Sequence, residues 1–373
     1  MEMNIKNWFE KYSSNTLAGS GSQTFFDTEK ELIHRGRIYY KIFAGGSYGY
    51  SLLFSNILNS TFEDGSRSRC NMLCEELDLR KVTVGVCKEC SEAVAAEPKN
   101  TRVLSFNGKI CKHVMPGEIF ASDEFLLSAE KDEYLCVEIE FSGTKIPYHE
   151  ESILPAFIWE DGEWKASKKL PFPEMIGCDR KTDLRIGFLG DSITQGCGTP
   201  VNAYAHWCAL AAEKIGERYS YWNLGFGYAR AQDAASDGVW LMKAKQMDWV
   251  ILCLGTNDIG QKRAEEDIKR DLECIVLKLK EAGVKMLLQT LPPFSWQGEE
   301  LKKWLHINEY IKGDLSKFAE AVFDIAPFLT DSEQEGKAKY VEHPNEEGSR
   351  IWAEELVCFI RKNISGMWET KCE

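Results

Sequence analysis

The sequence lacks long apolar runs. None of its 373 residues falls in a stretch of about 18 consecutive apolar residues, the length of a membrane-spanning helix. The first residues, MEMNIKNWFE, carry acidic side chains and lack the apolar core of a secretory signal. The chain has fewer basic than acidic residues, with 45 Lys and Arg and 58 Asp and Glu, which gives a net charge of -13. We therefore expect a cytoplasmic protein that binds neither membranes nor nucleic acid, with a neutral or cationic substrate.

Internal repeats and low-complexity segments are also missing, which argues against an elongated solenoid. The hydrophobic content of 44% and the charged content of 28% are typical of a folded, soluble protein. The chain is longer than one hydrophobic core usually requires, and its length fits two domains.

A disulfide framework is not indicated. The 13 cysteines are odd in number and scattered along the chain, which suits a reducing compartment. Cys70, Cys74, Cys87 and Cys90 form a C-x3-C and a C-x2-C pattern that could hold zinc. We favour unrelated thiols, because a β-sandwich needs no metal, and we expect neither a metal nor another cofactor.

Three short motifs together supply the groups of an acyl-transfer site. Ser192 lies in GDSI, Asn257 in GTND and His343 in HPN. A serine hydroxyl is a poor nucleophile until an adjacent base takes its proton, and an amide can stabilise the resulting oxyanion. Each motif alone has an ordinary interpretation, such as a helix cap, a polar turn or a surface histidine. Their joint occurrence predicts a serine esterase.

Strands and helices alternate through the C-terminal half. Ser192 follows a short apolar run at 184–190 and precedes an Ala-rich helix expected at 203–215. Four more strands are expected at 221–224, 249–254, 284–289 and 321–325, with a clear amphipathic helix at 264–282. Helical crossovers make such a sheet parallel, and its ligands bind beyond the carboxyl ends of the strands. The loops at 225–228 and 292–296, together with the three motifs, should share that edge.

Residues 180 to 373 resemble the SGNH (GDSL-type) hydrolases, whose name lists a Ser, a Gly, an Asn and a His in four sequence blocks. GDSIT, GTND and EHPN match the first, third and fourth blocks. The second block usually reads Asn-x-Gly-x-x-Gly, and this chain has NLGFGYAR from Asn223 onward. That string fits if one residue is deleted before the second glycine. The resemblance implies a flavodoxin-like α/β domain with a five-stranded parallel sheet.

Carried over to this chain, the resemblance assigns the catalytic groups. Ser192 would be the nucleophile and His343 its general base. The oxyanion hole would consist of the Ser192 N–H, the Gly227 N–H and the side-chain amide of Asn257, with Gly225 as the fallback for Gly227. No cofactor is implied.

One position departs from the family. The family commonly places an Asp three residues before the histidine, where it orients the imidazole, but this chain has Tyr340 there. Glu342, a distant carboxylate such as Asp331, or a backbone carbonyl could hold the imidazole instead. We favour a Ser-His dyad, as in some carbohydrate esterases of the family that carry an added β domain.

The N-terminal part is rich in short β-type runs broken by Gly, Asn and Asp between residues 36 and 157, which predicts an all-β sandwich. The strings GRIYYKIFAGGSYGYSLLFSN and IPYHEESILPAF resemble the jelly-roll domain that precedes the hydrolase domain in certain SGNH carbohydrate esterases. We expect a jelly-roll domain at 1–160, a linker at 161–181 and the hydrolase domain at 182–373.

The expected activity is hydrolysis of short acyl esters, most simply acetyl esters, of a carbohydrate such as an oligosaccharide. Acetyl and carbohydrate are implied by the two-domain resemblance. Tyr228 and Trp296 are candidates for lining the substrate site, because aromatic faces suit sugar rings; packing within their loops is an equal alternative. A general lipase, arylesterase or thioesterase, and a carbohydrate-binding protein with a silent hydrolase domain, remain open, as does a homo-oligomer.

Overall fold

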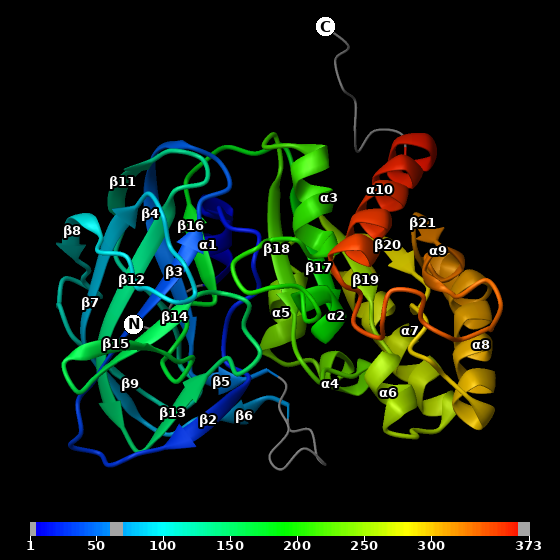
Figure 1. Cartoon of the computed structure of the whole chain (residues 1–373), viewed down its shortest axis with the longest axis horizontal. Coiled ribbons are helices and arrows are strands. Elements are labelled where there is room, and N and C mark those ends of the chain that lie inside the picture. The colour runs from blue at the N-terminus through cyan, green and yellow to red at the C-terminus, as the bar shows by residue number, and fades with distance from the viewer. Residues whose placement is uncertain (1–4, 60–69, 365–373) are drawn as a thin grey trace, which may run out of the picture. The chain divides into compact units, whose positions relative to one another are not determined.

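The computed structural model describes residues 5–59 and 70–364, which form two compact units (Figure 1). The first unit runs to Asp183 and also contains Val201–Ala203 and Glu217–Trp222. The second comprises Leu184–Pro200, Tyr204–Gly216 and the chain from Asn223 onward. Residues 1–4, where the predicted jelly-roll domain begins, and 365–373, where the predicted hydrolase domain ends, lie outside the described residues.

The first unit is built mainly of antiparallel strands. Its larger sheet has the order β15 (Glu163–Ala166), β14 (Ala156–Glu160), β3 (His34–Lys41), β12 (Tyr134–Gly143), β7 (Leu77–Cys87) and β8 (Lys99–Val103), with β9 (Lys112–Val114) beside β7. The second sheet has the order β1 (Ser13–Ser14), β16 (Met175–Cys178), β4 (Gly46–Ser55) and β10 (Ile119–Ala121), with β11 (Phe125–Ala129) also paired to β4.

Smaller elements complete this unit. They are the helix α1 (Ile5–Lys11) and the strand pairs β2 (Thr24–Asp27) with β13 (Lys145–Tyr148) and β5 (Ile57–Leu58) with β6 (Met72–Leu73). Two sheets of antiparallel strands agree with the expected β-sandwich, whereas the jelly-roll connectivity stays a prediction. The segment 161–181, expected as a linker, contains β15 and β16, which pair with β14 and β4.

Side-chain alternation explains which face each strand buries. Along β11, Phe125, Leu127 and Ala129 are buried while Leu126 and Ser128 are exposed, the two-residue period of a strand with one face in a core. The central strand β12 is buried along most of its length because it pairs with β3 on one side and β7 on the other.

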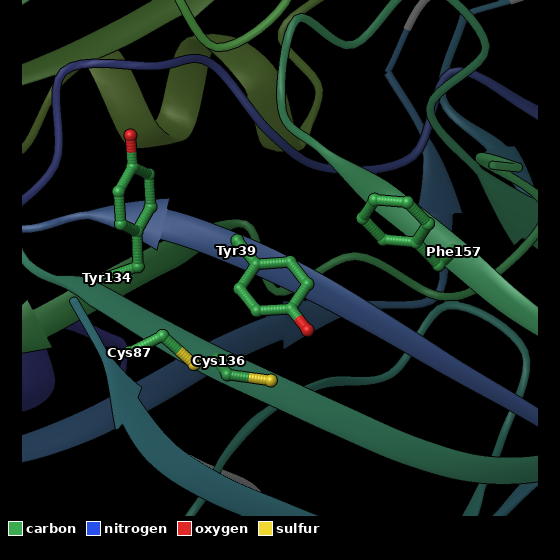
Figure 2. Packing of buried hydrophobic residues seen from close by; sticks show 5 residues of the cluster. All are labelled: Tyr39, Cys87, Tyr134, Cys136 and Phe157. Atoms are coloured by element: carbon green, nitrogen blue, oxygen red, sulfur yellow. The ribbon is translucent and has the colours of Figure 1, made fainter. Parts of the chain in front are cut away.

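One cluster in the larger sheet contains two thiols (Figure 2). Figure 2 shows Tyr39 of β3, Phe157 of β14 and Cys87 of β7 together with Tyr134 and Cys136 of β12. The rings of Tyr39 and Phe157 meet edge to face with centroids 5.9 Å apart. Hydrogen bonding with Cys87, followed by burial, holds the pKa of Cys136 well above its usual value.

The cysteine pattern noted in the sequence gathers no metal-binding cluster in the described part of the chain. Cys90 packs against the cluster that contains Cys87. Among residues 5–59 and 70–364, no group of three or more His, Cys, Asp or Glu side chains is placed to hold a metal ion. No disulfide joins the cysteines in the part of the chain that the structure describes.

The second unit is organised on a sheet that has five strands within the described residues. Their order is β18 (Ser220–Gly225), β17 (Arg185–Gly190), β19 (Trp249–Cys253), β20 (Lys285–Gln289) and β21 (Ala321–Phe323). The pairs β17–β19, β19–β20 and β20–β21 are parallel. In chain order this is the arrangement 2-1-3-4-5 of flavodoxin-like folds, as expected from the sequence.

Helices connect these strands and follow the last of them. They are α2 (Ser192–Gln195), α3 (Trp207–Ile215), α4 (Ala231–Ala235), α5 (Val239–Ala244), α6 (Thr256–Gly260), α7 (Glu265–Glu281), α8 (Gly298–Lys312), the 3-10 helix η1 (Leu315–Phe318), α9 (Ala326–Leu329) and α10 (Glu346–Asn363). No helix among the described residues has the length and apolar character needed to cross a membrane.

Three of these helices show what holds the layers together. On α7, Ile268, Leu272, Ile275 and Leu279 form one buried stripe at helical spacing, and Gly283 follows with a φ of 81°. Helices α3 and α10 pack through Trp207 and Trp352, whose rings stack with centroids 4.8 Å apart.

Candidate active site

Ser192 is the first residue of α2, directly after the turn that leaves β17. Asp191 caps this short helix, because its carboxylate accepts the Ile193 N–H at 3.0 Å. Gly190 ends the strand, and a β-carbon at this position would lie 2.6 Å from the Cys253 carbonyl oxygen. The turn therefore requires glycine at 190 and fixes the backbone of Ser192, which is only 7% exposed.

His343 meets the serine from a distant part of the chain. Its Nε2 lies 2.8 Å from the Ser192 Oγ, across 151 positions of sequence. His343 lies two residues before Asn345, which caps α10 by accepting the Gly348 N–H at 3.0 Å. The loop after α2 packs closely against the histidine, because a β-carbon added at Gly198 would lie only 2.9 Å from the His343 Cβ.

The electrostatics favour a neutral imidazole. Burial lowers the pKa of His343 below its usual value of 6.5, because a cation loses solvation, and the Glu342 charge opposes that shift only as the smaller effect. A neutral imidazole can accept the serine proton. The distance and the charge state together are what a hydroxyl-activating pair needs.

The carboxylates considered as imidazole orienters are engaged elsewhere. A hydrogen bond with Ser295 is the main reason that the pKa of Glu342 lies below its usual value. Asp331 accepts the Glu333 N–H at 2.9 Å and pairs with Lys337 at 3.5 Å. Within residues 5–59 and 70–364, neither carboxylate forms a hydrogen bond to the His343 ring, and Glu342 acts on it only through its charge.

An aromatic ring contacts the histidine. The rings of Phe294 and His343 lie nearly perpendicular, at 76°, with centroids 5.3 Å apart. Phe294 also packs on Trp296 at 5.3 Å. The sequence predicted that the loop 292–296 lies at the catalytic edge, with Trp296 as the candidate substrate-lining residue. Nothing in the sequence pattern distinguishes Trp296 from Phe294, so the contact between Phe294 and the histidine was not predicted. Trp296 is 8% exposed, and its buried indole nitrogen has no hydrogen-bond partner among the described residues, so the indole is largely packed inside this loop.

The side-chain amide of Asn257 lies at the start of α6, just beyond β19. Its Nδ2 donates to the Ala229 carbonyl at 3.0 Å, which uses one of its two hydrogens. The residue is half-buried. The second hydrogen of this amide is the one that could serve an oxyanion.

The two glycines proposed as oxyanion donors already donate their N–H groups. The Gly227 N–H donates to the Gln195 Oε1 at 2.7 Å, and the Gly225 N–H donates to the Asn223 Oδ1 at 2.9 Å. In this conformation neither N–H is available to a substrate, which counts against both assignments. Tyr228 follows directly, is 38% exposed and has a φ of 61°.

Two buried carboxylates within the motifs are structural. Burial raises the pKa of Asp191 to about 7 and that of Asp258 to about 6. Asp258 accepts the Ala231 N–H at 2.8 Å and pairs with Arg263. Asp191 and Asp258 therefore fix the loops that carry Ser192 and Asn257.

A flavodoxin-like α/β unit with a hydrogen-bonded Ser-His pair beyond the ends of its strands is an arrangement that serine hydrolases use, and it points to a hydrolase of the esterase or lipase type. Residues 188–351 match the GDSL-like Lipase/Acylhydrolase family. This part of the chain is a domain of that family. A search of curated proteins found no match to the chain.

Solved structures similar to this chain cover about half of it. A member of the lipolytic protein G-D-S-L family from Veillonella parvula DSM 2008 is 21% identical, over 48% of this chain and 98% of its own, with a TM-score of 0.42. An acetyl xylan esterase is 20% identical over 47% and 99%, with a TM-score of 0.40. An aryl esterase from M. smegmatis is 20% identical over 48% and 99%, with a TM-score of 0.38.

Proposed function

We propose that the protein is a serine esterase that removes short acyl groups, above all acetyl, from a carbohydrate. The observation that carries the proposal is the 2.8 Å approach of the Ser192 Oγ to the His343 Nε2, with the Asn257 amide on the neighbouring strand end. Acetyl and carbohydrate rest on the resemblance of the sequence to two-domain carbohydrate esterases. The net charge of -13 favours a neutral substrate over an anionic one.

The reaction follows from these groups in two stages. In the first, the Ser192 Oγ attacks the ester carbonyl while His343 Nε2 takes the hydroxyl proton. The oxyanion collapses, the bond to the sugar oxygen breaks, and His343 returns its proton to that oxygen. In the second, His343 takes a proton from water, the resulting hydroxide attacks the acyl-serine, and the carboxylic acid leaves as Ser192 regains its proton.

The imidazole works without a bound carboxylate in this proposal. Ser192 and Phe294 contact it, while Glu342 acts only through its charge. A Ser-His dyad of this kind stabilises the imidazolium less than a triad does. The oxyanion donors then supply the larger share of the transition-state stabilisation, at about 2.7 to 4 kcal/mol for each donor.

Acetate release from acetylated xylo-oligosaccharides and manno-oligosaccharides tests the proposal. Ser192→Ala should lower acetate release to background, because it removes the nucleophile, while circular dichroism shows an intact fold. Nitrophenyl esters of increasing chain length, measured alongside, distinguish an acetylesterase from a general lipase or arylesterase, which would prefer longer acyl chains. Unchanged turnover in Ser192→Ala would remove this serine from the mechanism.

Carbohydrate binding without ester hydrolysis would be a different result with a different interpretation. If the wild-type protein releases no acid from any short-chain ester but retains affinity for an oligosaccharide by calorimetry, the hydrolase domain is silent and the protein is a carbohydrate binder. Ser192→Ala is then the matched control, since its affinity should equal that of the wild type.

A further inference from the structure

The hairpin of β14 and β15 carries two tryptophans at one edge of the larger sheet (Figure 1). Trp159 of β14 is the cross-strand partner of Trp164 of β15, and the two indole rings meet with centroids 5.2 Å apart at an angle of 67°. The connecting turn, Asp161-Gly162, has φ values of 53° and 85°, the left-handed pair that a two-residue hairpin turn requires. This turn fixes the register that brings the two rings together.

Charged side chains of the neighbouring strands hold the rings in place. The guanidinium of Arg37 lies 4.2 Å from the centre of the Trp164 ring. The guanidinium of Arg35 lies 5.1 Å from that centre and 5.7 Å from the centre of the Trp159 ring. Glu138 of β12 accepts the Nε–H of Arg35 at 2.7 Å and that of Arg37 at 2.5 Å. The rings therefore rest on a layer of ion-paired guanidiniums, which favours one orientation of each indole.

This cluster is open to solvent although its lower layer is buried. Arg37 is 4% exposed, whereas Trp159 is 40% exposed and the Arg35 side chain is also 40% exposed. Glu97 accepts both terminal nitrogens of Arg37 at 2.9 Å, and its side chain is 75% exposed. A guanidinium has five N–H donors and a carboxylate has about four acceptor positions, so both groups can also bind a ligand. Exposed tryptophan held beside such groups is characteristic of binding surfaces.

Charge and size indicate which ligand this surface fits. The two carboxylates and two guanidiniums named above carry no net charge together, which favours a neutral ligand over an anionic polymer. A protein partner usually buries about 800 Å² on each side, whereas two tryptophans offer at most about 500 Å². A sugar ring matches the surface, because its C–H groups can meet the negative face of an indole while its hydroxyls bond to the N–H and carboxylate groups.

We propose that an accessory surface of the first unit binds a neutral oligosaccharide and consists of Trp159, Trp164, Arg35 and Glu97. The indole rings stack on sugar units, Arg35 donates to sugar hydroxyls, and Glu97 accepts from them. The choice of a carbohydrate rests on the proposed function. The surface adds affinity for the glycan that carries the ester and takes no part in the chemistry at Ser192.

Titration calorimetry with unacetylated xylohexaose and mannohexaose tests the assignment on the full chain, because neither probe carries an ester. We expect Trp159→Ala to raise the Kd of the hexasaccharide that binds by at least about tenfold, as removal of a central aromatic anchor does. Trp159→Phe keeps an aromatic face and should lose less affinity than Trp159→Leu, which keeps an apolar side chain without one. Leu126→Ala removes an exposed apolar side chain from β11 of the second sheet, and as the matched control it should bind like the wild type.

A spectroscopic readout in the unsubstituted protein locates the ligand even where the alanine variant fails to fold. Labelling with 5-fluorotryptophan gives a fluorine NMR signal for each of the 11 tryptophans. The spectra of Trp159→Phe and Trp164→Phe assign the two signals of the hairpin. Both signals should move when the hexasaccharide is added.

The outcomes distinguish this inference from the proposed function. No binding of either hexasaccharide, equal affinity of Trp159→Phe and Trp159→Leu, or fluorine shifts confined to tryptophans outside the hairpin would each overturn the accessory surface. A wild-type protein that hydrolyses no ester, but whose hexasaccharide binding depends on Trp159, would overturn the esterase and leave the surface in place. Release of acetate by a protein that binds neither hexasaccharide would do the reverse.

Discussion

At the residue scale, His343 touches a hydroxyl and a phenyl ring. The Ser192 Oγ lies 2.8 Å from Nε2, and the ring of Phe294 stands across the imidazole at a centroid distance of 5.3 Å. Neither contact stabilises a positive charge as a bound carboxylate would. The imidazole is therefore mostly neutral near neutral pH and available as a base, but it is a weaker base, so the transition state depends more on the oxyanion donors.

This balance predicts the acid limb of the pH profile. The base must be neutral, and burial holds the pKa of His343 below 6.5. The value of kcat/KM for a neutral acetyl ester should be constant between about pH 7 and pH 8 and fall with an apparent pKa below 6.5. Glu342→Gln removes the charge that raises this pKa. The acid limb of the kcat/KM profile of the Glu342→Gln variant should therefore lie at lower pH than that of the wild type. An apparent pKa above 7 would show that a carboxylate controls the imidazole.

Phe294 gives the second prediction at this scale. Phe294→Ala removes the ring that packs on the imidazole, so the histidine should sample unproductive orientations and kcat should fall by about 10-fold to 100-fold, with a smaller effect on KM. Phe294→Tyr keeps the ring and is the matched control, with a kcat close to that of the wild type. Equal kcat in the alanine and tyrosine variants would show that the ring has no part in positioning His343.

At the scale of elements, the sequence predicted the hydrolase sheet well because buried parallel strands are apolar runs of characteristic length. The run 249–254 corresponds to β19 (Trp249–Cys253), and the stripe at 264–282 corresponds to α7 (Glu265–Glu281). The helix expected from 203 begins only at Trp207, because Asn202 and Tyr204 have positive φ values that a helix cannot contain. Composition carries no signal for such backbone angles.

Helix α1 and the site residues outside the motifs could not be predicted from the sequence either, because they depend on tertiary contacts. Helix α1 is only 7 residues long, and its burial of Trp8 and Phe9 depends on tertiary packing. Ser192, Asn257 and His343 lie in motifs and could be named from the sequence. Gln195 and Phe294 could not, because their roles depend on which backbone N–H and which ring they meet in the fold.

The cap of α2 predicts a pH-dependent stability. Burial raises the pKa of Asp191 from 3.8 to about 7, so its contribution to stability is fully present below pH 3.8 and is lost as the pH rises through about 7. Asp191→Asn keeps an oxygen acceptor for the Ile193 N–H and has no charge to bury. Thermal unfolding of both proteins should show the asparagine variant gaining stability relative to the wild type between pH 5 and pH 8. A constant difference across that range would contradict the shifted pKa.

At the scale of the whole molecule, the division of the chain into units does not follow the sequence order. Strand β18 (Ser220–Gly225) belongs to the hydrolase sheet, yet residues up to Trp222 are grouped with the first unit. In that unit the Trp222 ring lies 5.3 Å from the ring of Phe9, and its indole nitrogen donates to the Glu174 carbonyl at 3.2 Å. Arg180 likewise donates to the Tyr219 carbonyl at 2.9 Å.

These contacts predict that the hydrolase part is not stable when expressed alone from residue 184. Removal of residues 1–183 takes away both partners of Trp222 and the Arg180 side chain. Exposure of one large buried aromatic side chain costs about 1.5–3 kcal/mol, and the indole N–H also loses its acceptor. We expect the 184–373 fragment to unfold at lower urea concentration than the hydrolase transition of the full chain, or to aggregate on expression. Phe9→Ala in the full chain should reproduce part of this loss, whereas a fragment with undiminished stability and turnover would show that these contacts of Trp222 and Tyr219 contribute nothing to stability.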